Sequence, residues 1–157
     1  MITIRNFSEN DQPHFEALNR NWIETYFWME AFDEWVLTQP YKAILEPGGA
    51  ILIAEYDGKV AGTVALRKIN GDTYEFTKMA VDPAFQRKGI AASLSNAAFN
   101  TVRQLGGNHV ILYSQTGLSA AIRLYRRLGF KEIPLDAGTL YKRSDIKMEI
   151  YLDMKSN

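Results

Sequence analysis

The sequence predicts a single domain of the α/β class. Its expected elements run in the order strand, two helices, three strands, helix, strand, helix, strand and strand. Two junctions in the second half share one form, in which an apolar strand is followed by a short turn and a long helical pattern. With 157 residues, 46% of them hydrophobic, the chain is long enough to bury a full core as one domain.

The first part of the chain combines one strand with two helices. Residues 2–7 alternate between apolar and polar side chains, as a half-buried strand does. A helix capped by Ser8 or Asn10 should follow. A second helix is expected over residues 31–38, and Pro40 should break it or its extension.

Three consecutive strands come next. Residues 50–56 and 60–68 flank Asp57-Gly58-Lys59, a short turn suited to a hairpin. A third strand, over residues 73–81, follows the turn at Asn70-Gly71-Asp72.

The second half continues with helix, strand, helix and two strands. Gly106-Gly107 stops the first of these helices, and its apolar positions fall on one side: Ile90, Leu94, Ala97, Thr101 and Leu105. The other expected elements are a strand at 109–114, a helix that ends at Gly129, and strands at 131–135 and 146–152.

Composition excludes several classes of protein. Eighteen Lys and Arg residues balance 18 Asp and Glu residues, and this neutrality argues against general nucleic-acid binding. There are no cysteines, so a disulfide framework, a cysteine-rich zinc site and a cysteine acyl-enzyme are excluded. His14 and His109 stand far apart, and no metal site is expected. Without an apparent signal peptide or membrane span, the expected location is cytoplasmic, with no membrane partner.

The segment after Val81 has the composition of a pyrophosphate-binding turn. The start of a helix leaves backbone N–H groups without partners and carries partial positive charge. Gly89 and Ala91 keep the turn free of side-chain bulk, and Arg87 and Lys88 add full positive charge. The pattern therefore indicates a phosphate site at a helix N-terminus. The plainer alternative is an ordinary strand–turn–helix junction.

Two signatures in this order resemble those of the GCN5-related N-acetyltransferases. Gln86-Arg87-Lys88-Gly89-Ile90-Ala91 is similar to the family's Gln/Arg-x-x-Gly-x-Gly/Ala loop. Downstream, Ala121, Tyr125, Gly129 and Phe130 match the spacing of its closing signature, Ala-x-x-x-Tyr-x-x-x-Gly-Phe. Two ordered signatures are much more specific than either alone, and the resemblance extends over residues 51–152.

The resemblance implies a fold and a cosubstrate. The fold would be a mixed, mostly antiparallel sheet of about six or seven strands with helices on both faces. The cosubstrate would be acetyl-coenzyme A, with its pyrophosphate held by Gln86, Arg87, Lys88, Gly89, Ile90, Ala91 and Ala92. The strand at 73–81 should splay from the strand at 109–114. That splay would free backbone groups of Met79, Ala80 and Val81 for the pantetheine arm, and the N–H of Val81 or Met79 for the developing oxyanion.

Acyl transfer from a thioester to an amine needs an acid and a base. An alkylamine with a pKa near ~10 is mostly protonated at neutral pH, so it must lose a proton before it attacks. The resemblance makes Tyr125 the acid for the leaving thiolate, although its place on an apolar helix face also fits a core tyrosine. Glu75 is the candidate base. The alternative is an edge or solvent-facing glutamate paired with Lys78 or a neighbouring strand.

One position departs from the family pattern, and the first half of the chain matches only in layout. Leu118 stands where many relatives carry an asparagine, with Gln115 and Thr116 just upstream. By resemblance the acceptor site lies under a cluster of aromatic residues that equally fits a core: Trp22, Tyr26, Phe27, Trp28, Phe32 and Trp35. Acidic residues among them could attract a cationic amine or form a solvated face: Glu24, Glu30, Asp33 and Glu34.

Taken together, the sequence predicts an N-acetyltransferase that moves an acetyl group directly from the thioester to the primary amine of a small molecule. One alternative is a protein acetyltransferase that acts on an N-terminus or a lysine. Another is a sensor that binds acyl-coenzyme A without turnover. The resemblance also allows a homodimer.

Overall fold

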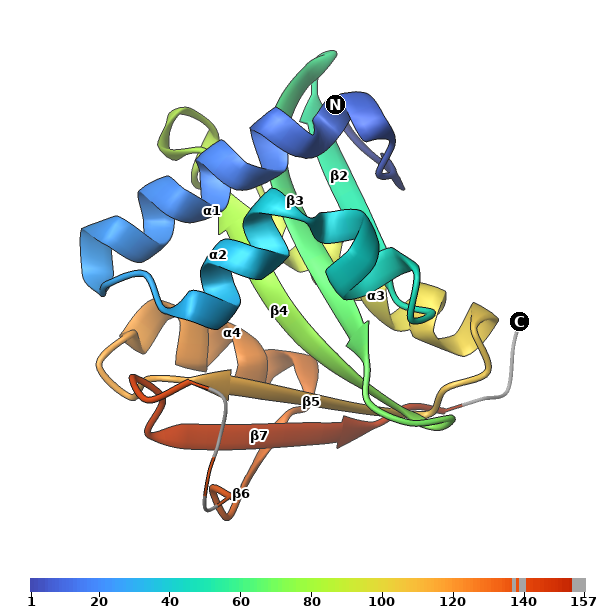
Figure 1. Ribbon diagram of the computed structural model, residues 1–157, viewed down its shortest axis with the longest axis vertical. Helices are drawn as coiled ribbons and strands as arrows, with labels where there is room; N and C mark the ends of the chain where they lie inside the picture. Colours follow the sequence, from blue (N-terminus) through green and yellow to red (C-terminus); the bar gives the residue numbers. More distant parts are fainter. Residues whose placement is uncertain (137, 139–140, 154–157) are drawn as a thin grey trace.

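The computed structural model describes residues 1–136, 138 and 141–153, and its centre is a seven-stranded sheet (Figure 1). The strand order is β1-β2-β3-β4-β5-β7-β6, and every neighbouring pair is antiparallel except β4 and β5. The strands are β1 (Ile2–Asn6), β2 (Ala50–Tyr56), β3 (Lys59–Lys68), β4 (Thr73–Val81), β5 (His109–Ser114), β6 (Lys131–Ile133) and β7 (Ile146–Tyr151). The predicted fold class and mostly antiparallel sheet are confirmed.

Helices cover both faces of the sheet (Figure 1). They are α1 (Gln12–Tyr26), α2 (Ala31–Thr38), α3 (Ile90–Gln104) and α4 (Ser119–Leu128). Helices α1 and α2 share one hydrophobic cluster with Ile51, while α3 and α4 pack into a second cluster that contains Leu52. Because successive side chains of a strand point to opposite faces, these two neighbours serve the two clusters, and β2 is apolar along most of its length.

The strands β4 and β5 separate after a short stretch of pairing. Only Thr73, Tyr74 and Glu75 of β4 pair with β5, opposite residues 109–111. Both strands continue beyond that point, and Figure 1 shows them diverging. The sheet therefore opens along the C-terminal half of β4, as the resemblance implied.

A β-bulge lies in β4 beside this opening. Thr77 pairs with Ala65 and Ala80 pairs with Thr63, so Lys78 and Met79 both stand opposite the single residue 64 of β3. Lys78 takes a left-handed conformation with φ of 55°. A bulge of this kind redirects side chains, and here it aims the Lys78 side chain at Asp33 of α2.

The predicted end of α2 is confirmed, because the helix stops at Thr38, two residues before Pro40. Pro40 then begins a separate π-helical turn, Tyr41–Leu45; proline fits at a helix start, where its missing N–H is not needed. One local prediction is wrong: the buried face of α3 is rotated from the predicted one, and Leu105 is 43% exposed. The residues of α3 that are buried are Ile90, Leu94, Ser95, Ala98, Phe99 and Val102.

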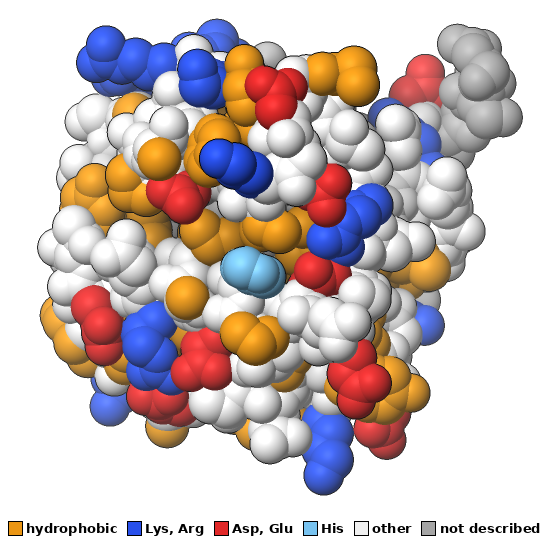
Figure 2. Space-filling view, turned by 90° about the horizontal axis from the view of Figure 1, so that it is seen from above, with side chains coloured by type: hydrophobic (Ala, Val, Ile, Leu, Met, Phe, Trp, Pro, Cys, Tyr) orange, Lys and Arg blue, Asp and Glu red, His pale blue; other side chains and the backbone are white. Residues whose placement is uncertain are grey.

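Charged side chains of both signs are interspersed over the face shown in Figure 2, in keeping with the zero net charge. In the part of the chain that the structure describes, no helix combines the length and the apolar character needed to cross a membrane.

Candidate active site

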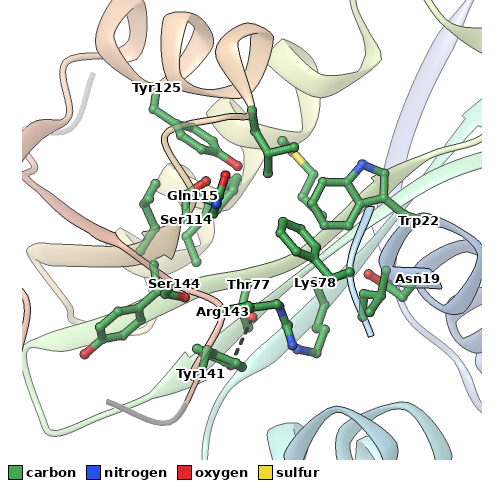
Figure 3. A pocket seen from close by; sticks show the side chains of 17 residues that line it. Asn19, Trp22, Thr77, Lys78, Ser114, Gln115, Tyr125, Tyr141, Arg143 and Ser144 are labelled. Atoms are coloured by element: carbon green, nitrogen blue, oxygen red, sulfur yellow. Dashed lines mark hydrogen bonds between the residues drawn. The ribbon is translucent and has the colours of Figure 1, made fainter. Parts of the chain in front are cut away.

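A pocket occupies the opening between β4 and β5 (Figure 3). Its walls come from α1, β4, β5, α4 and the segment that precedes β7. The lining residues are Asn19, Trp22, Ile23, Phe27, Phe76, Thr77, Lys78, Met79, Leu112, Tyr113, Ser114, Gln115, Leu118, Tyr125, Tyr141, Arg143 and Ser144. The divergence of two parallel strands thus produces a site that five chain segments share.

Tyr125 projects from α4 into this pocket (Figure 3). Its ring packs edge-on against Phe76, with 6.0 Å between centroids, and against Phe130, with 5.9 Å. Within the described part of the chain its hydroxyl has no hydrogen-bond partner. Burial raises the pKa of Tyr125 to about 12, so the phenol keeps its proton at neutral pH. The hydroxyl is therefore a free donor inside the pocket.

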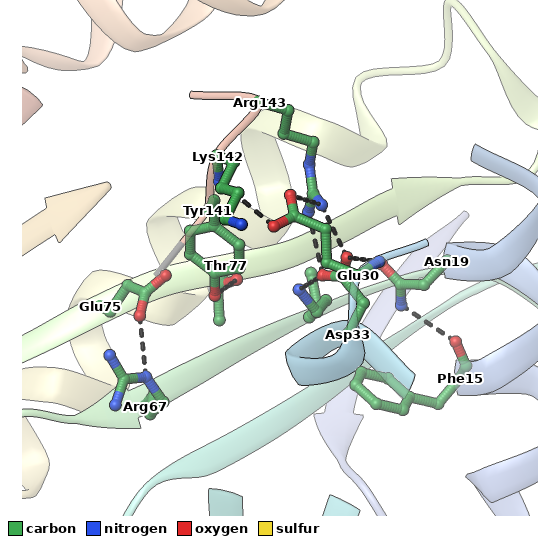
Figure 4. A network of polar contacts seen from close by, with 11 residues as sticks. Phe15, Asn19, Glu30, Asp33, Arg67, Glu75, Thr77, Tyr141, Lys142 and Arg143 are labelled. Atoms are coloured by element: carbon green, nitrogen blue, oxygen red, sulfur yellow. Dashed lines mark hydrogen bonds and ion pairs between the residues drawn. The ribbon is translucent and has the colours of Figure 1, made fainter. Parts of the chain in front are cut away.

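Glu75 lies on β4 but is not among the residues that line the pocket. Its carboxylate is 1% exposed and accepts a 2.8 Å hydrogen bond from Nε of Arg67 on β3. Burial and the nearby Glu75 carboxylate together raise the pKa of Tyr141 well above its usual value, and Figure 4 shows the two side chains next to each other. Tyr141 in turn lines the pocket, with its hydroxyl 3.4 Å from Oγ1 of Thr77.

The turn before α3 leaves the first amides of the helix open. Gly89 is the N-cap residue, with φ of 80°, and no side chain caps the helix. A Cβ atom on Gly89 would meet no atom within 4 Å outside the adjoining residues, so there is open space beside this residue. The amides of Ile90, Ala91 and Ala92 have no acceptor inside the helix. This end of α3 can therefore accept an anion.

Met79 connects this turn to the pocket. It lines the pocket, and its Sδ atom lies 3.9 Å from Oγ of Ser95, one turn into α3. Ala80 and Val81 continue the ladder with β3 and are not among the lining residues. The structure thus brings Met79 and Tyr125 into one pocket and places residues 86–92 beyond it at the start of α3.

A network of charged groups lies at the other end of the pocket (Figure 4). Asp33 accepts hydrogen bonds from Lys78 Nζ at 2.7 Å and from both terminal nitrogens of Arg143, at 2.6 and 2.9 Å. Arg143 also donates to Glu30 at 2.9 Å. The Asp33 side chain is fully buried, and the side chains of Lys78 and Arg143 are 3% and 11% exposed.

The network shifts the pKa values of its members. Burial alone would raise the pKa of Asp33, but the Arg143 hydrogen bonds and the Lys78 charge outweigh it and hold that pKa at about 2. Burial lowers the pKa of Lys78, against the opposing pull of Asp33. Asp33 is thus a buried carboxylate that stays ionised because two cations share it.

The aromatic cluster divides between pocket and surface. Trp22 and Phe27 line the pocket. Tyr26, Trp28 and Trp35 are 56%, 60% and 45% exposed.

The predicted acidic residues take other places. Asp33 and Glu30 bind Arg143, Glu34 binds Arg20, and Glu24 is exposed. None of these carboxylates is among the pocket-lining residues in the described chain. The same described residues contain no group of three or more His, Cys, Asp or Glu residues placed to hold a metal ion.

Sequence reasoning missed the roles of Lys78, Tyr141 and Arg143. Lys78 and Glu75 are the two charged residues of β4, a largely apolar strand, and such a position was a usable signal for a buried charge. Tyr141 and Arg143 belong to an irregular segment without periodicity, so no local pattern could have placed them.

Comparison with known proteins gives concordant matches. Residues 7–130 match the model of the acetyltransferase (GNAT) family. An uncharacterized N-acetyltransferase of Escherichia coli, YjgM, is 33% identical over 105 residues, which is 65% of this chain and 63% of YjgM. The chain thus spans less than two thirds of that relative's length.

Solved structures show the same fold. An acetyltransferase of the GNAT family from Staphylococcus aureus superposes with a TM-score of 0.86 at 16% identity, over 98% of this chain and 100% of that one. A putative acetyltransferase from Salmonella typhimurium, solved with its cofactor acetyl-CoA, gives 0.75 at 22% identity, over 100% and 97%.

Proposed function

This chain belongs to the GNAT family of acetyltransferases, and from that premise we propose that it transfers an acetyl group from acetyl-coenzyme A to the primary amine of a small molecule. The observation that carries the proposal is the Tyr125 hydroxyl in the opening between β4 and β5, which has no hydrogen-bond partner among the described residues.

The residues present fit the cosubstrate. Open amides at the start of α3 match the needs of a pyrophosphate, and the open space beside Gly89 is in keeping with a close approach to this turn. Gln86, Arg87 and Lys88 would complete this seat, the latter two with positive charge. The free edge of β4 near Met79 leads from the turn to the pocket, as an extended pantetheine arm requires.

Two side chains would handle the protons. Acetyl-coenzyme A, when bound, supplies an activated acetyl group as a thioester. The amine nitrogen forms a bond to the acetyl carbon as the carbon–sulfur bond breaks, and Tyr125 donates its proton to the leaving sulfur. Glu75 would accept the proton that the amine loses, by way of Tyr141 or water, since Glu75 itself does not line the pocket. The products are the N-acetylated amine and coenzyme A.

The backbone of β4 would stabilise the negative charge that develops on the acetyl oxygen. Of the two predicted N–H groups, that of Met79 is the better placed, because Met79 lines the pocket and Val81 does not.

The shape of the pocket favours a small acceptor over a protein. Trp22 of α1 and Phe27, which directly follows that helix, form one wall, and Tyr141 and Ser144 form another. Arg143 joins the second wall to the start of α2 through Asp33 and Glu30, and its guanidinium lies over the ring of Phe27 in the first wall, 5.6 Å from the centroid. A peptide would need a groove that is open at both ends.

Calorimetric titration with acetyl-coenzyme A tests the proposal. Wild-type protein should bind saturably, and Gly89→Asp should lose binding because its carboxylate would stand beside the pyrophosphate. Gly106→Asp is the matched control. Gly106 follows the other end of α3 and has φ of 88°, and a Cβ atom there would likewise meet no atom within 4 Å, so the substitution is comparably strained. It should keep wild-type affinity.

The experiment has three distinguishable outcomes. Binding that Gly89→Asp abolishes and Gly106→Asp preserves, followed by turnover with small amines, supports the proposal. A folded wild-type protein that does not bind acetyl-coenzyme A contradicts it, and binding without turnover of any amine would favour the sensor.

A further inference from the structure

The charged groups that line the pocket are all cationic. Arg143 and Lys78 are its only charged lining residues in the described chain. The carboxylates that neutralise them, Asp33 and Glu30, contact the same cations but do not line the pocket. A ligand in the pocket therefore meets positive charge first.

Arg143 has one unused edge. Its guanidinium carries five N–H donors. Asp33 takes the edge formed by Nη1 and Nη2, and Glu30 takes the outer side of Nη1. This leaves the Nε–H and the outer Nη2–H, which point in parallel from one edge of the plane, and neither has an acceptor among the described residues. Two parallel donors match the two oxygens of a carboxylate.

The guanidinium is also held in place. Its central carbon lies over the ring of Phe27, 5.6 Å from the centroid, and over the ring of Tyr141, at 5.1 Å. Both rings line the pocket. Two aromatic rings and two carboxylates thus fix Arg143 before any ligand arrives, so little conformational entropy remains to be lost on binding.

The geometry points to an acceptor that carries a carboxylate as well as its amine, bound along the free edge of Arg143 with Lys78 adding positive charge. This inference rests on the proposed function and narrows its acceptor to amino acids and related amino carboxylates. A polyamine would bring a second cation against Arg143 and Lys78, which repel it.

The same cations would assist the chemistry. An amine must be neutral to attack the thioester, and nearby positive charge lowers the pKa of an ammonium group. A carboxylate on the acceptor therefore provides the attraction, while Arg143 and Lys78 favour loss of the amine proton. One pair of residues serves both demands.

The inference is tested by comparing two sets of acceptors that differ only in the carboxylate. The common α-amino acids are compared with their α-carboxamides, which keep the amine and side chain but lack the negative charge. Acetylation by the wild-type protein is followed as kcat/KM, and binding of each compound without acetyl-coenzyme A is followed by calorimetry. We expect the best amino acid to exceed its carboxamide by about 10- to 100-fold, both in kcat/KM and in binding affinity. That is the range for a charge-assisted hydrogen bond.

Variants at Arg143 test whether this residue causes the preference for a carboxylate. Arg143→Gln should reduce the preference for an amino acid over its carboxamide to within about threefold. The change should come chiefly through KM, and the Kd for acetyl-coenzyme A should stay the same. Arg143→Lys keeps the charge that Asp33 needs but loses the parallel donors. Its preference for amino acids should therefore lie between those of the wild type and Arg143→Gln. Arg20→Gln is the control, because Arg20 binds Glu34 of α2 through two hydrogen bonds, at 3.0 and 2.7 Å, outside the pocket. It should keep the wild-type preference.

The outcomes separate this inference from the proposed function. Acetylation of carboxamides as readily as of amino acids overturns the inference and leaves acetyl transfer intact. Amino-acid binding that depends on Arg143, in a protein that does not bind acetyl-coenzyme A, supports the carboxylate site and contradicts the transferase. Equal binding of both sets, or of neither, overturns the inference whatever the protein does with acetyl-coenzyme A.

Discussion

Arg143 binds Asp33 through two hydrogen bonds of 2.6 and 2.9 Å, although the residues lie 110 positions apart. The pair joins α2 to the segment before β7, and Lys78 of β4 binds the same carboxylate at 2.7 Å. Three separate parts of the chain therefore meet on one buried acid, at the end of the pocket that we assign to the acceptor.

Replacing that acid should destabilise the fold. Asp33→Asn leaves Lys78 and Arg143 without their shared anion, and loss of one partner of a buried ion pair costs about 3–5 kcal/mol. Urea unfolding at neutral pH measures the difference. Asp72→Asn, at an exposed turn, should change the free energy of unfolding by less than about 0.5 kcal/mol. An Asp33→Asn protein as stable as wild type would show that the network contributes no stability.

Stability should also fall in acid. The pKa of Asp33 is about 2 in the folded protein against an ordinary 3.8, so the unfolded chain binds more protons between these values. The contribution of Asp33, about 2 kcal/mol, is complete above about pH 4 and is lost as the pH falls through 2. Asp11, whose pKa Arg5 holds at about 2, adds a loss of the same sign. Unfolding free energies measured from pH 7 to 2 should stay level and then drop below about pH 4; a drop that begins near pH 6 would contradict this assignment.

Tyr125→Phe should separate chemistry from binding. Without the hydroxyl, kcat should fall by about 10²- to 10⁴-fold, while the Kd for acetyl-coenzyme A stays unchanged because the ring packing is kept. Tyr151→Phe, at a 67% exposed position, is the control. Because the pKa of Tyr125 is about 12, its ionisation should cause no loss of wild-type activity below about pH 10. A Tyr125→Phe enzyme with unchanged kcat would remove the proposed acid.

Glu75→Gln should lower kcat without weakening cosubstrate binding, if this carboxylate takes the amine proton. The effect should lie within the range of about 10²- to 10⁴-fold for general base catalysis. Glu55→Gln is a close control: Glu55 also lies on a strand and accepts a hydrogen bond from an arginine Nε, at 2.9 Å from Arg5. Equal rates for both variants would mean that Glu75 only pairs with Arg67.

Gly49→Ala should weaken the fold without touching the site. A Cβ at Gly49 would lie 2.2 Å from the carbonyl oxygen of Leu66 and 2.7 Å from that of Ile44, and backbone atoms move at high cost. We expect a loss of about 3 kcal/mol, and so a Tm lower by roughly 6–12 °C. Gly71→Ala, with open space around it, should leave the Tm nearly unchanged. A calorimetric scan of the two variants decides the point.

Local sequence patterns predicted most of the fold. The bounds of α2, β2, β4 and β5 agree with prediction, because residues that interrupt regular structure stand at most of their ends. These residues are Gly49 and Asp57 around β2, Asp72 and Asp82 around β4, Asn108 before β5 and Pro40 after α2. The face of α3 was less predictable. Small residues such as Ala97 and Ala98 are weak guides to which face of a helix is buried. In the folded protein Ala98 is buried against the sheet and Ala97 is not fully buried.

The residues of the candidate site also differ in how far the sequence could indicate them. The turn before α3 and Tyr125 belong to contiguous signatures, so the sequence could indicate them. The bond between Arg143 and Asp33 has no local signature, since it forms only when α2 and the segment before β7 meet over the sheet. The place of Arg143 in the pocket was therefore beyond sequence reasoning, which had pointed to the acidic residues near the aromatic cluster.

A crystal structure with coenzyme A bound tests the central claim most directly. We expect the pyrophosphate on the amides of Ile90, Ala91 and Ala92, and the sulfur within hydrogen-bond distance of the Tyr125 hydroxyl, between β4 and β5. A coenzyme A molecule bound elsewhere, or a sulfur out of reach of Tyr125, would contradict it.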